Sequence, residues 1–181
     1  MKSNLIIRES TLSDLDNLLA VERAAFGSEE EAELVRNLLD DPSAEPRLSL
    51  LALQKQQAVG HILFTRAYLN PEIDLRVSIL APLAVIPDYQ KQGVGGSLIK
   101  EGLAILEKDG VDLVFVLGHP SYYPLHGFKP AVPVGFEPPY FIPAEFSDAW
   151  MVQALNPTCW GSYQGQVNCA QALDRSEYWG E

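Results

Sequence analysis

The most constraining feature of the sequence is a glycine-rich segment, residues 90–97 (Gln-Lys-Gln-Gly-Val-Gly-Gly-Ser), between two apolar stretches of different periodicity. Before it, residues 77–85 are apolar enough to form a strand that is buried on both faces. After it, apolar residues recur at helical spacing as far as Gly110. Glycines at such a junction let the main chain approach a ligand, and the free amides at a helix N-terminus attract an anion. The segment therefore predicts a phosphate-binding loop.

Two common glycine-rich loops do not fit this segment. A Walker loop needs Gly-Lys followed by Ser or Thr, which hold the terminal phosphates and magnesium, and no such sequence follows Gly93. A dinucleotide fingerprint needs a third glycine where this chain has Leu98, and it opens a βαβ unit rather than following a hairpin. The segment is therefore interpreted as a phosphate-binding loop of a third kind, different from both of these.

The rest of the chain predicts strands and helices on both sides of the loop. Capping boxes at Thr11 with Asp14 and at Ser28 with Glu31 each predict the start of a helix. Strands are expected at 48–53 and 59–68 as a hairpin, then at 77–85, 111–117 and 149–155. Because a strand, a loop, a helix and a second strand form a right-handed crossover, strands 77–85 and 111–117 should be parallel neighbours.

Pro82 interrupts the buried strand before the loop. A proline donates no hydrogen bond to a sheet ladder. The strand must therefore be bulged at Pro82, or unpaired on the side where its amide would point.

The charge balance restricts the partners of the chain. Its 181 residues include 13 basic and 24 acidic side chains, for a net charge of −11. A field of this sign repels nucleic-acid backbones and anionic membranes and attracts a cationic substrate. The longest apolar stretch, 79–86, is far shorter than the roughly 20 residues of a membrane-spanning helix. We expect a cytoplasmic protein with no nucleic-acid or membrane partner. The cysteines and histidines lack metal-ligand spacing, so no metal is predicted.

The loop also resembles a known family. In its position between an irregular strand and an amphipathic helix, Gln90-x-x-Gly93-x-Gly95 is similar to the pyrophosphate-binding motif of the GCN5-related N-acetyltransferases, which bind acetyl-coenzyme A (acetyl-CoA). Segments 82–87 and 117–128, the second reading Leu-Gly-His-Pro-Ser-Tyr-Tyr-Pro-Leu-His-Gly-Phe, resemble the YhbS-like branch of that superfamily.

This resemblance implies a single N-acetyltransferase domain over residues 1–181. It covers about residues 5–155, with 156–181 as a tail or an extension of the sheet edge. The implied fold is α/β (α+β): a mixed, mostly antiparallel central sheet with a splayed parallel strand pair and helices on both faces. Pairing of an exposed last strand with a second copy, and so a homodimer, stays open.

The resemblance also implies how acetyl-CoA is held. Leu83, Ala84 and Val85 would offer main-chain groups to the pantetheine arm, which binds in the splay like an added strand. Loop amides would surround the diphosphate, and Gln90 would brace the loop. The residues expected to bind the cofactor here are Gln90, Lys91, Gln92, Gly93, Val94, Gly95, Gly96 and Ser97. The alternative for the glycines is an ordinary tight turn.

Tyr123 matches the family position that protonates the departing thiolate, and a phenol with a pKa of ~10 suits that task. It would also contact the cofactor; its alternative role is an aromatic plug beneath the pantetheine. His119 is a candidate base, because an imidazole has a pKa of about 6.5, or it orders the turn at Tyr122. Glu72 and Asp74 are the other candidate bases. The remaining histidines, His61 and His126, carry no functional signal.

The resemblance therefore implies an N-acetyltransferase that transfers acetyl from acetyl-CoA to a primary amine by direct attack in a ternary complex. The acceptor is a small metabolite or a protein amine. Segments 26–33 and 70–76 are expected to hold its specificity. The alternative is a non-catalytic acyl-CoA-binding sensor or interaction module.

Overall fold

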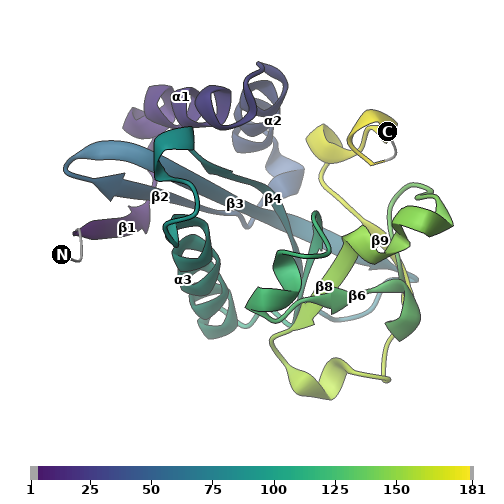
Figure 1. Ribbon diagram of the computed structural model, residues 1–181. Coiled ribbons are helices and arrows are strands. Elements are labelled where there is room, and N and C mark those ends of the chain that lie inside the picture. Colours follow the sequence, from purple (N-terminus) through teal and green to yellow (C-terminus); the bar gives the residue numbers. More distant parts are fainter. Residues whose placement is uncertain (1–3, 180–181) are drawn as a thin grey trace.

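The computed structural model describes residues 4–179, and over this range the chain forms a central sheet with helices on both faces (Figure 1). The strands are β1 (Leu5–Glu9), β2 (Leu48–Gln54), β3 (Gln57–Asn70), β4 (Val77–Val85), β5 (Leu113–Leu117), β6 (Lys129–Pro130), β7 (Phe136–Glu137), β8 (Trp150–Ala154) and β9 (Gly165–Asn168). The helices are α1 (Leu15–Phe26), α2 (Glu30–Leu39) and α3 (Val94–Lys108), with several short 3-10 turns between the other elements.

The strands lie in the order β1-β2-β3-β4-β5-β8-β6, and β9 pairs with the end of β3 and with β7. Along that path every pair is antiparallel except β4 and β5, which run parallel. The predicted fold class, a mostly antiparallel sheet with one parallel pair between helical layers, is confirmed.

The parallel pair separates part of the way along β4. Its ladder joins Val77–Leu80 to 113–116 and goes no further, although β4 continues to Val85 on the other side, against β3. On the β3 side, Leu80 pairs with Phe64 and Leu83 pairs with Ile62. Two residues of β4, one of them Pro82, therefore stand opposite a single residue of β3. This is the bulge that the proline predicted.

Strand alternation sends successive side chains into two separate cores. Ile79 packs in the cluster that contains Leu34 and Leu38 of α2, whereas its neighbour Leu80 packs in the cluster that contains Leu98 of α3. Helices α1 and α2 therefore cover one face of the sheet and α3 covers the other (Figure 1).

The two capping signatures have different outcomes. The box at Thr11 is confirmed: its amide donates to Oδ2 of Asp14 at 2.7 Å and opens the 3-10 turn that leads into α1. The second box is displaced, because α2 begins at Glu30 and the hydroxyl of Ser28 bonds only the carboxylate of Glu31, at 2.9 Å. In the described part of the chain, no helix has the length and apolar character needed to span a bilayer.

Candidate active site

The gap between β4 and β5 exposes one edge of β4. The amide of Ile86 donates to the carbonyl of Val59 at 3.0 Å, which marks those two residues as a hydrogen-bonded pair of the antiparallel ladder. By alternation, the main-chain groups of Ala84 also face β3, whereas those of Leu83 and Val85 face away from it. Of the three strand residues expected to meet pantetheine, two direct main-chain groups to the open side.

The glycine-rich loop is tied to the end of this open edge. Nε2 of Gln90 donates to the carbonyl of Val85 at 2.9 Å, and Nε2 of Gln92 donates to the carbonyl of Asp88 at 3.0 Å. The side chain of Gln90 thus joins the last residue of β4 to the segment that leads into α3. This contact holds the loop and the strand edge in one arrangement.

The loop presents a run of unpaired main-chain N–H groups. Within residues 4–179, the amides from Lys91 to Gly96 donate to no protein atom; the first that does is Ser97, to the carbonyl of Gly93 at 3.0 Å. Lys91 and Gly93 have φ angles of 61° and 87°, so left-handed residues curl the chain into a concave row of donors. A Cβ on Gly93 would have nothing within 4 Å. With the dipole of α3, this row can cradle an anion such as a diphosphate.

The turn that carries the tyrosine pair packs onto the same helix end. A Cβ at Gly95 would lie 2.7 Å from the hydroxyl of Tyr122, and one at Gly96 would lie 2.9 Å from Cε1 of His126. The rings of Tyr122 and His126 are 4.9 Å apart. Two of the loop glycines therefore make room for this turn. No role was expected for His126, although its spacing of four residues from Tyr122 places both on one side of a helical turn.

Tyr123 lies at the wall of the gap. Its ring packs so closely on Gly118 that a side chain there would overlap it, and its centroid is 5.7 Å from that of Phe128. Although the residue is buried, it lines a cavity between the splayed ends of β4 and β5. Burial raises the pKa of the Tyr123 phenol, and the neighbouring Tyr122 raises it by a smaller amount. The hydroxyl therefore keeps its proton.

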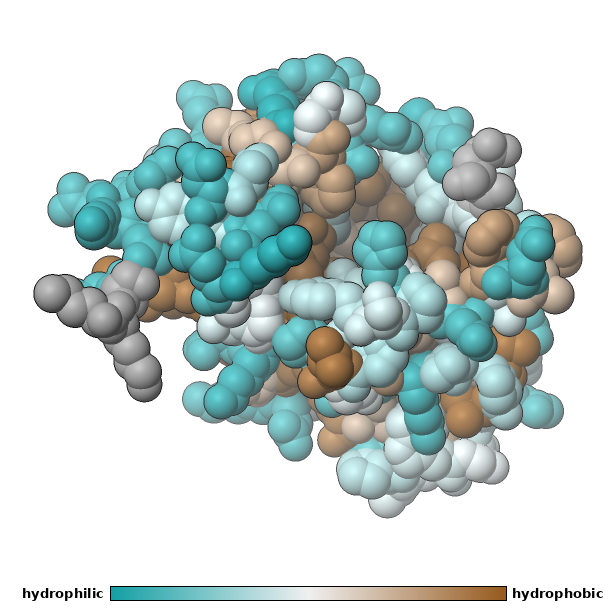
Figure 2. All heavy atoms as spheres, viewed as in Figure 1, coloured by the Kyte–Doolittle hydropathy of each residue, from teal (hydrophilic) through white to brown (hydrophobic). Residues whose placement is uncertain are grey.

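This cavity, which we call the cleft cavity, has a volume of about 380 Å³. Its walls come from β4 and β5, from the α1–α2 junction (Phe26, Glu30 and Glu31), and from Tyr178 and Trp179 near the C-terminus. In Figure 2 the surface is hollowed between the helices at the top and the C-terminal segment at the right, over a largely hydrophobic floor. Segment 26–33, which was expected to hold the substrate specificity, therefore borders the cleft cavity.

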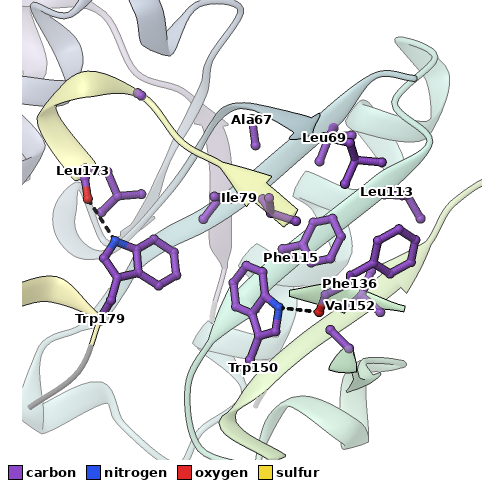
Figure 3. Packing of buried hydrophobic residues seen from close by; sticks show 14 of the residues in the cluster. Ala67, Leu69, Ile79, Leu113, Phe115, Phe136, Trp150, Val152, Leu173 and Trp179 are labelled. Atoms are coloured by element: carbon purple, nitrogen blue, oxygen red, sulfur yellow. Dashed lines mark hydrogen bonds between the residues drawn. The ribbon is translucent and has the colours of Figure 1, made fainter. Parts of the chain in front are cut away.

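The C-terminal wall of the cleft cavity is anchored in the core of the α2 face (Figure 3). Nε1 of Trp179 donates to the carbonyl of Leu173 at 3.0 Å, and its ring lies 5.5 Å from that of Trp150. Trp150 in turn stacks on Phe115 of β5 at 5.1 Å. Together with β9, which pairs with the end of β3, these contacts make the tail both an extension of the sheet and a fixed side of the cavity.

His119 also lines the cleft cavity and is exposed. Its carbonyl accepts from the amides of Tyr122 at 3.1 Å and Tyr123 at 3.3 Å, so its main chain orders the tyrosine turn. Among the described residues, none forms a hydrogen bond with its ring. The main chain therefore serves the turn while the ring stays available to a ligand.

The other two candidate bases lie elsewhere. Glu72 and Asp74 precede β4, at the end of the strand away from the loop, and line a separate cavity of about 930 Å³ with Asp109 at the end of α3. The structure does not bring them together with Tyr123. Segment 70–76 likewise borders that separate cavity rather than the cleft cavity.

A buried polar chain between α1 and the sheet was not expected from the sequence. Nδ1 of His61 lies 2.7 Å from Oε1 of Glu22, and Nε2 lies 2.9 Å from Oγ of Ser49, which accepts from Ser10 at 2.6 Å. Glu22 and His61 are fully buried, and burial raises the pKa of Glu22. Glu22 is one helical turn before Phe26, on the side of α1 that meets the cavity. No local pattern in the sequence marks this pair.

Comparison with known proteins agrees with this geometry. The family model described as an acetyltransferase (GNAT) domain matches residues 6–131. The chain is 51% identical over 160 residues to the uncharacterized N-acetyltransferase YjhQ of Escherichia coli strain K12, covering 87% of this chain and 88% of YjhQ. It is 34% identical over 126 residues to the uncharacterized N-acetyltransferase YhbS of the same strain, covering 69% of this chain and 74% of YhbS.

Two solved structures are similar over nearly the whole chain. Escherichia coli YhbS in complex with CoA matches with a TM-score of 0.88 and 29% identity, covering 97% of this chain and 94% of that one. A GNAT family acetyltransferase from Brucella melitensis in complex with acetyl-CoA matches with a TM-score of 0.76 and 29% identity, covering 95% and 99%. The family expected from segments 90–97 and 117–128 is therefore confirmed: the chain belongs to the GCN5-related N-acetyltransferase (GNAT) family, in its YhbS-like branch.

Proposed function

We propose that the chain transfers an acetyl group from acetyl-CoA to a primary amine, by direct attack within a ternary complex. The observation that carries this proposal is the opening of β4 from β5 beyond Leu80, next to the row of free amides from Lys91 to Gly96. Similar structures have been solved with CoA and with acetyl-CoA, which supports the same cofactor for this chain.

The cofactor would bind along this edge. The amides at 91–96 would take the diphosphate, with Gln90 holding the loop against the end of β4. Main-chain groups of Leu83 and the amide of Val85, whose carbonyl already accepts from Gln90, would pair with the amide groups of pantetheine, as an added strand pairs with a sheet edge. This pose brings the thioester toward the cleft cavity, where Tyr123 lies.

The transfer itself needs a neutral amine, a stabilised oxyanion and a protonated leaving group. The amine nitrogen attacks the carbonyl carbon of the thioester, and a main-chain amide of the open β4 edge meets the oxyanion. As the carbon–sulfur bond breaks, its electron pair goes to sulfur, which takes the proton of Tyr123; the attacking nitrogen loses one proton to water as the amide forms, and water returns a proton to the Tyr123 phenolate. The products are the N-acetylated amine and the free thiol of CoA.

His119 would take the proton of the acceptor. An alkylammonium has a pKa of about 10.4, so at neutral pH a base or a water chain must remove its proton. The ring of His119 lines the cleft cavity with Tyr123. The proton would pass from the amine to the imidazole and then to solvent, because His119 is exposed.

The test is a product-resolved assay. The purified chain is mixed with acetyl-CoA and a panel of amines, and free thiol and acetylated amine are both quantified, while CoA binding is measured by calorimetry. We expect thiol and product in equal amounts with at least one amine. Tight CoA binding without thiol release for any amine would instead favour the acyl-CoA sensor.

A further inference from the structure

A second cavity adjoins the cleft cavity. It has a volume of about 440 Å³ and shares Leu117, Gly118, His119, Tyr178 and Trp179 with the cleft cavity. We call it the side cavity. The shared residues place the two cavities side by side, with His119 at the border of both. A molecule whose amine reaches the thioester has room there for the rest of its body.

The walls of the side cavity are mostly carbon. Ile142, Pro143 and Phe146 line it opposite Tyr178, and Phe146 is 59% exposed. Ligand sites of this kind are predominantly apolar, with a few polar groups that orient the ligand. An exposed aromatic side chain at the mouth of such a cavity favours an apolar or aromatic ligand body.

The charges around both cavities have one sign. Glu30 and Glu31 border the cleft cavity and Glu177 borders the side cavity. Among the described residues that line them there is no lysine or arginine, and His119 is the one side chain able to become cationic. Arg175 lines neither cavity, but it pairs with Glu177 at 3.7 Å and offsets part of the charge of that carboxylate.

The acidic lining of the two cavities should discriminate between amines according to the other charged groups that they carry. A carboxylate or phosphate on the acceptor would lose its water without gaining a cationic partner among the lining residues, and it would face the carboxylates of Glu30 and Glu31. We propose that the acceptor is a primary amine with an apolar or aromatic body and no anionic group, an inference that rests on the proposed function. Decarboxylated relatives of apolar amino acids have this chemistry, and the amino acids themselves do not.

The test uses matched acceptors. Phenethylamine is compared with phenylalanine, and 3-methylbutylamine with leucine; phenylalaninamide has nearly the shape of phenylalanine without its negative charge. For each, kcat/KM is measured from acetylated product. We expect the amine of each pair to exceed its amino acid by about tenfold or more, and the amide to exceed phenylalanine. Amino acids that react as well as the matched amines would overturn the inference.

A charge-reversed variant isolates the carboxylates. Glu30→Arg supplies the missing cation on the exposed first turn of α2, and should lower the phenethylamine-to-phenylalanine preference about tenfold. The matched control is Glu101→Arg, exposed on α3 across the sheet, which should leave the preference unchanged. An unchanged preference in Glu30→Arg would contradict a role for that charge.

A binding measurement separates this inference from the proposed function. If no amine releases thiol, the proposed transfer fails, and the acceptors are then titrated into the CoA-bound chain by calorimetry. Phenethylamine that binds more tightly than phenylalanine would still support the selectivity of the cavities. Equal affinity, or tighter binding of phenylalanine, would overturn it.

Discussion

The hydroxyl of Tyr122 occupies the space that a side chain at Gly95 would need, since a Cβ there would lie 2.7 Å from it. The next nearest neighbours of that Cβ, in Leu83 and Val85, are at 3.7 Å, an ordinary contact. Gly95 is thus needed for the tyrosine turn to close on α3, in addition to any direct role toward a phosphate. The contact joins the phosphate-binding loop to the turn that carries Tyr123.

Gly95→Ala should weaken CoA binding by about tenfold, because the new methyl displaces Tyr122 and with it the end of α3. The helix itself should not suffer, since alanine is the stronger helix former. Tyr122→Phe removes the clashing hydroxyl, so the double variant should regain most of the lost affinity. Calorimetric titration of CoA into the parent, both single variants and the double variant checks this coupling. Full affinity in Gly95→Ala would contradict it.

Tyr123→Phe should lower kcat about a hundredfold while leaving CoA affinity unchanged, because it removes a proton donor and keeps the ring. Burial raises the pKa of Tyr123, so in the parent the phenol stays protonated and its ionisation should not reduce the rate between about pH 6 and 9. Tyr122→Phe, at the adjacent ring, is the control. A Tyr123→Phe rate equal to that of the parent across this range would exclude the acid role.

The Arg8–Asp14 pair should contribute stability that is lost in acid. Two hydrogen bonds from Arg8, at 2.8 and 2.9 Å, and one from the amide of Thr11 hold the pKa of Asp14 well below its usual range. The pKa in the unfolded chain is about 3.9, so this stability is present above pH 4 and is lost as pH falls toward the folded value. The Tm deficit of Asp14→Asn should therefore shrink below about pH 4.

Thermal unfolding of the parent and of Asp14→Asn, followed from pH 7 to pH 2.5, measures that deficit. Asp16→Asn, at an exposed position of α1, provides the comparison. A deficit that stays constant with pH would show that the Asp14 carboxylate contributes no charge-dependent stability.

Breaking the buried Glu22–His61 contact should destabilise the fold strongly. His61→Leu leaves the Glu22 carboxyl buried without its partner, at a cost of about 3–5 kcal/mol. Glu22→Leu likewise leaves the His61 ring buried without its carboxyl partner. The double replacement should cost clearly less than the sum of the two, because neither Glu22 nor His61 then remains buried without the other. Urea unfolding of the four proteins gives the coupling, and additive costs would argue against it.

The parts of the fold that follow from local chemistry could be predicted from sequence. The periodicity before and after residues 90–97, the proline at 82 and the capping box at Thr11 each act within a few residues of the chain, so their consequences are visible in a linear pattern. The short strands β6, β7 and β9 are different. They contain two to four residues, too few for any alternation, and exist because distant segments pair with them.

The residues of the candidate site are likewise of two kinds: some belong to a local motif, and others are brought together only by the fold. The loop and Tyr123 come from local motifs, whereas the contact of Glu22 with His61 joins residues 39 apart and has no local signature. The location of Glu72 and Asp74 could have been deduced. A nine-residue strand spans about 30 Å, so residues before β4 lie at the far end of the sheet from a loop that follows it.

The most direct test of the account is a crystal structure of this chain with acetyl-CoA. We expect diphosphate oxygens to accept hydrogen bonds from the amides at 91–96, and the pantetheine arm to lie between β4 and β5 with its sulfur beside the hydroxyl of Tyr123. A diphosphate bound away from these amides, or a β4–β5 ladder that continues past Leu80 and leaves the arm outside, would contradict it.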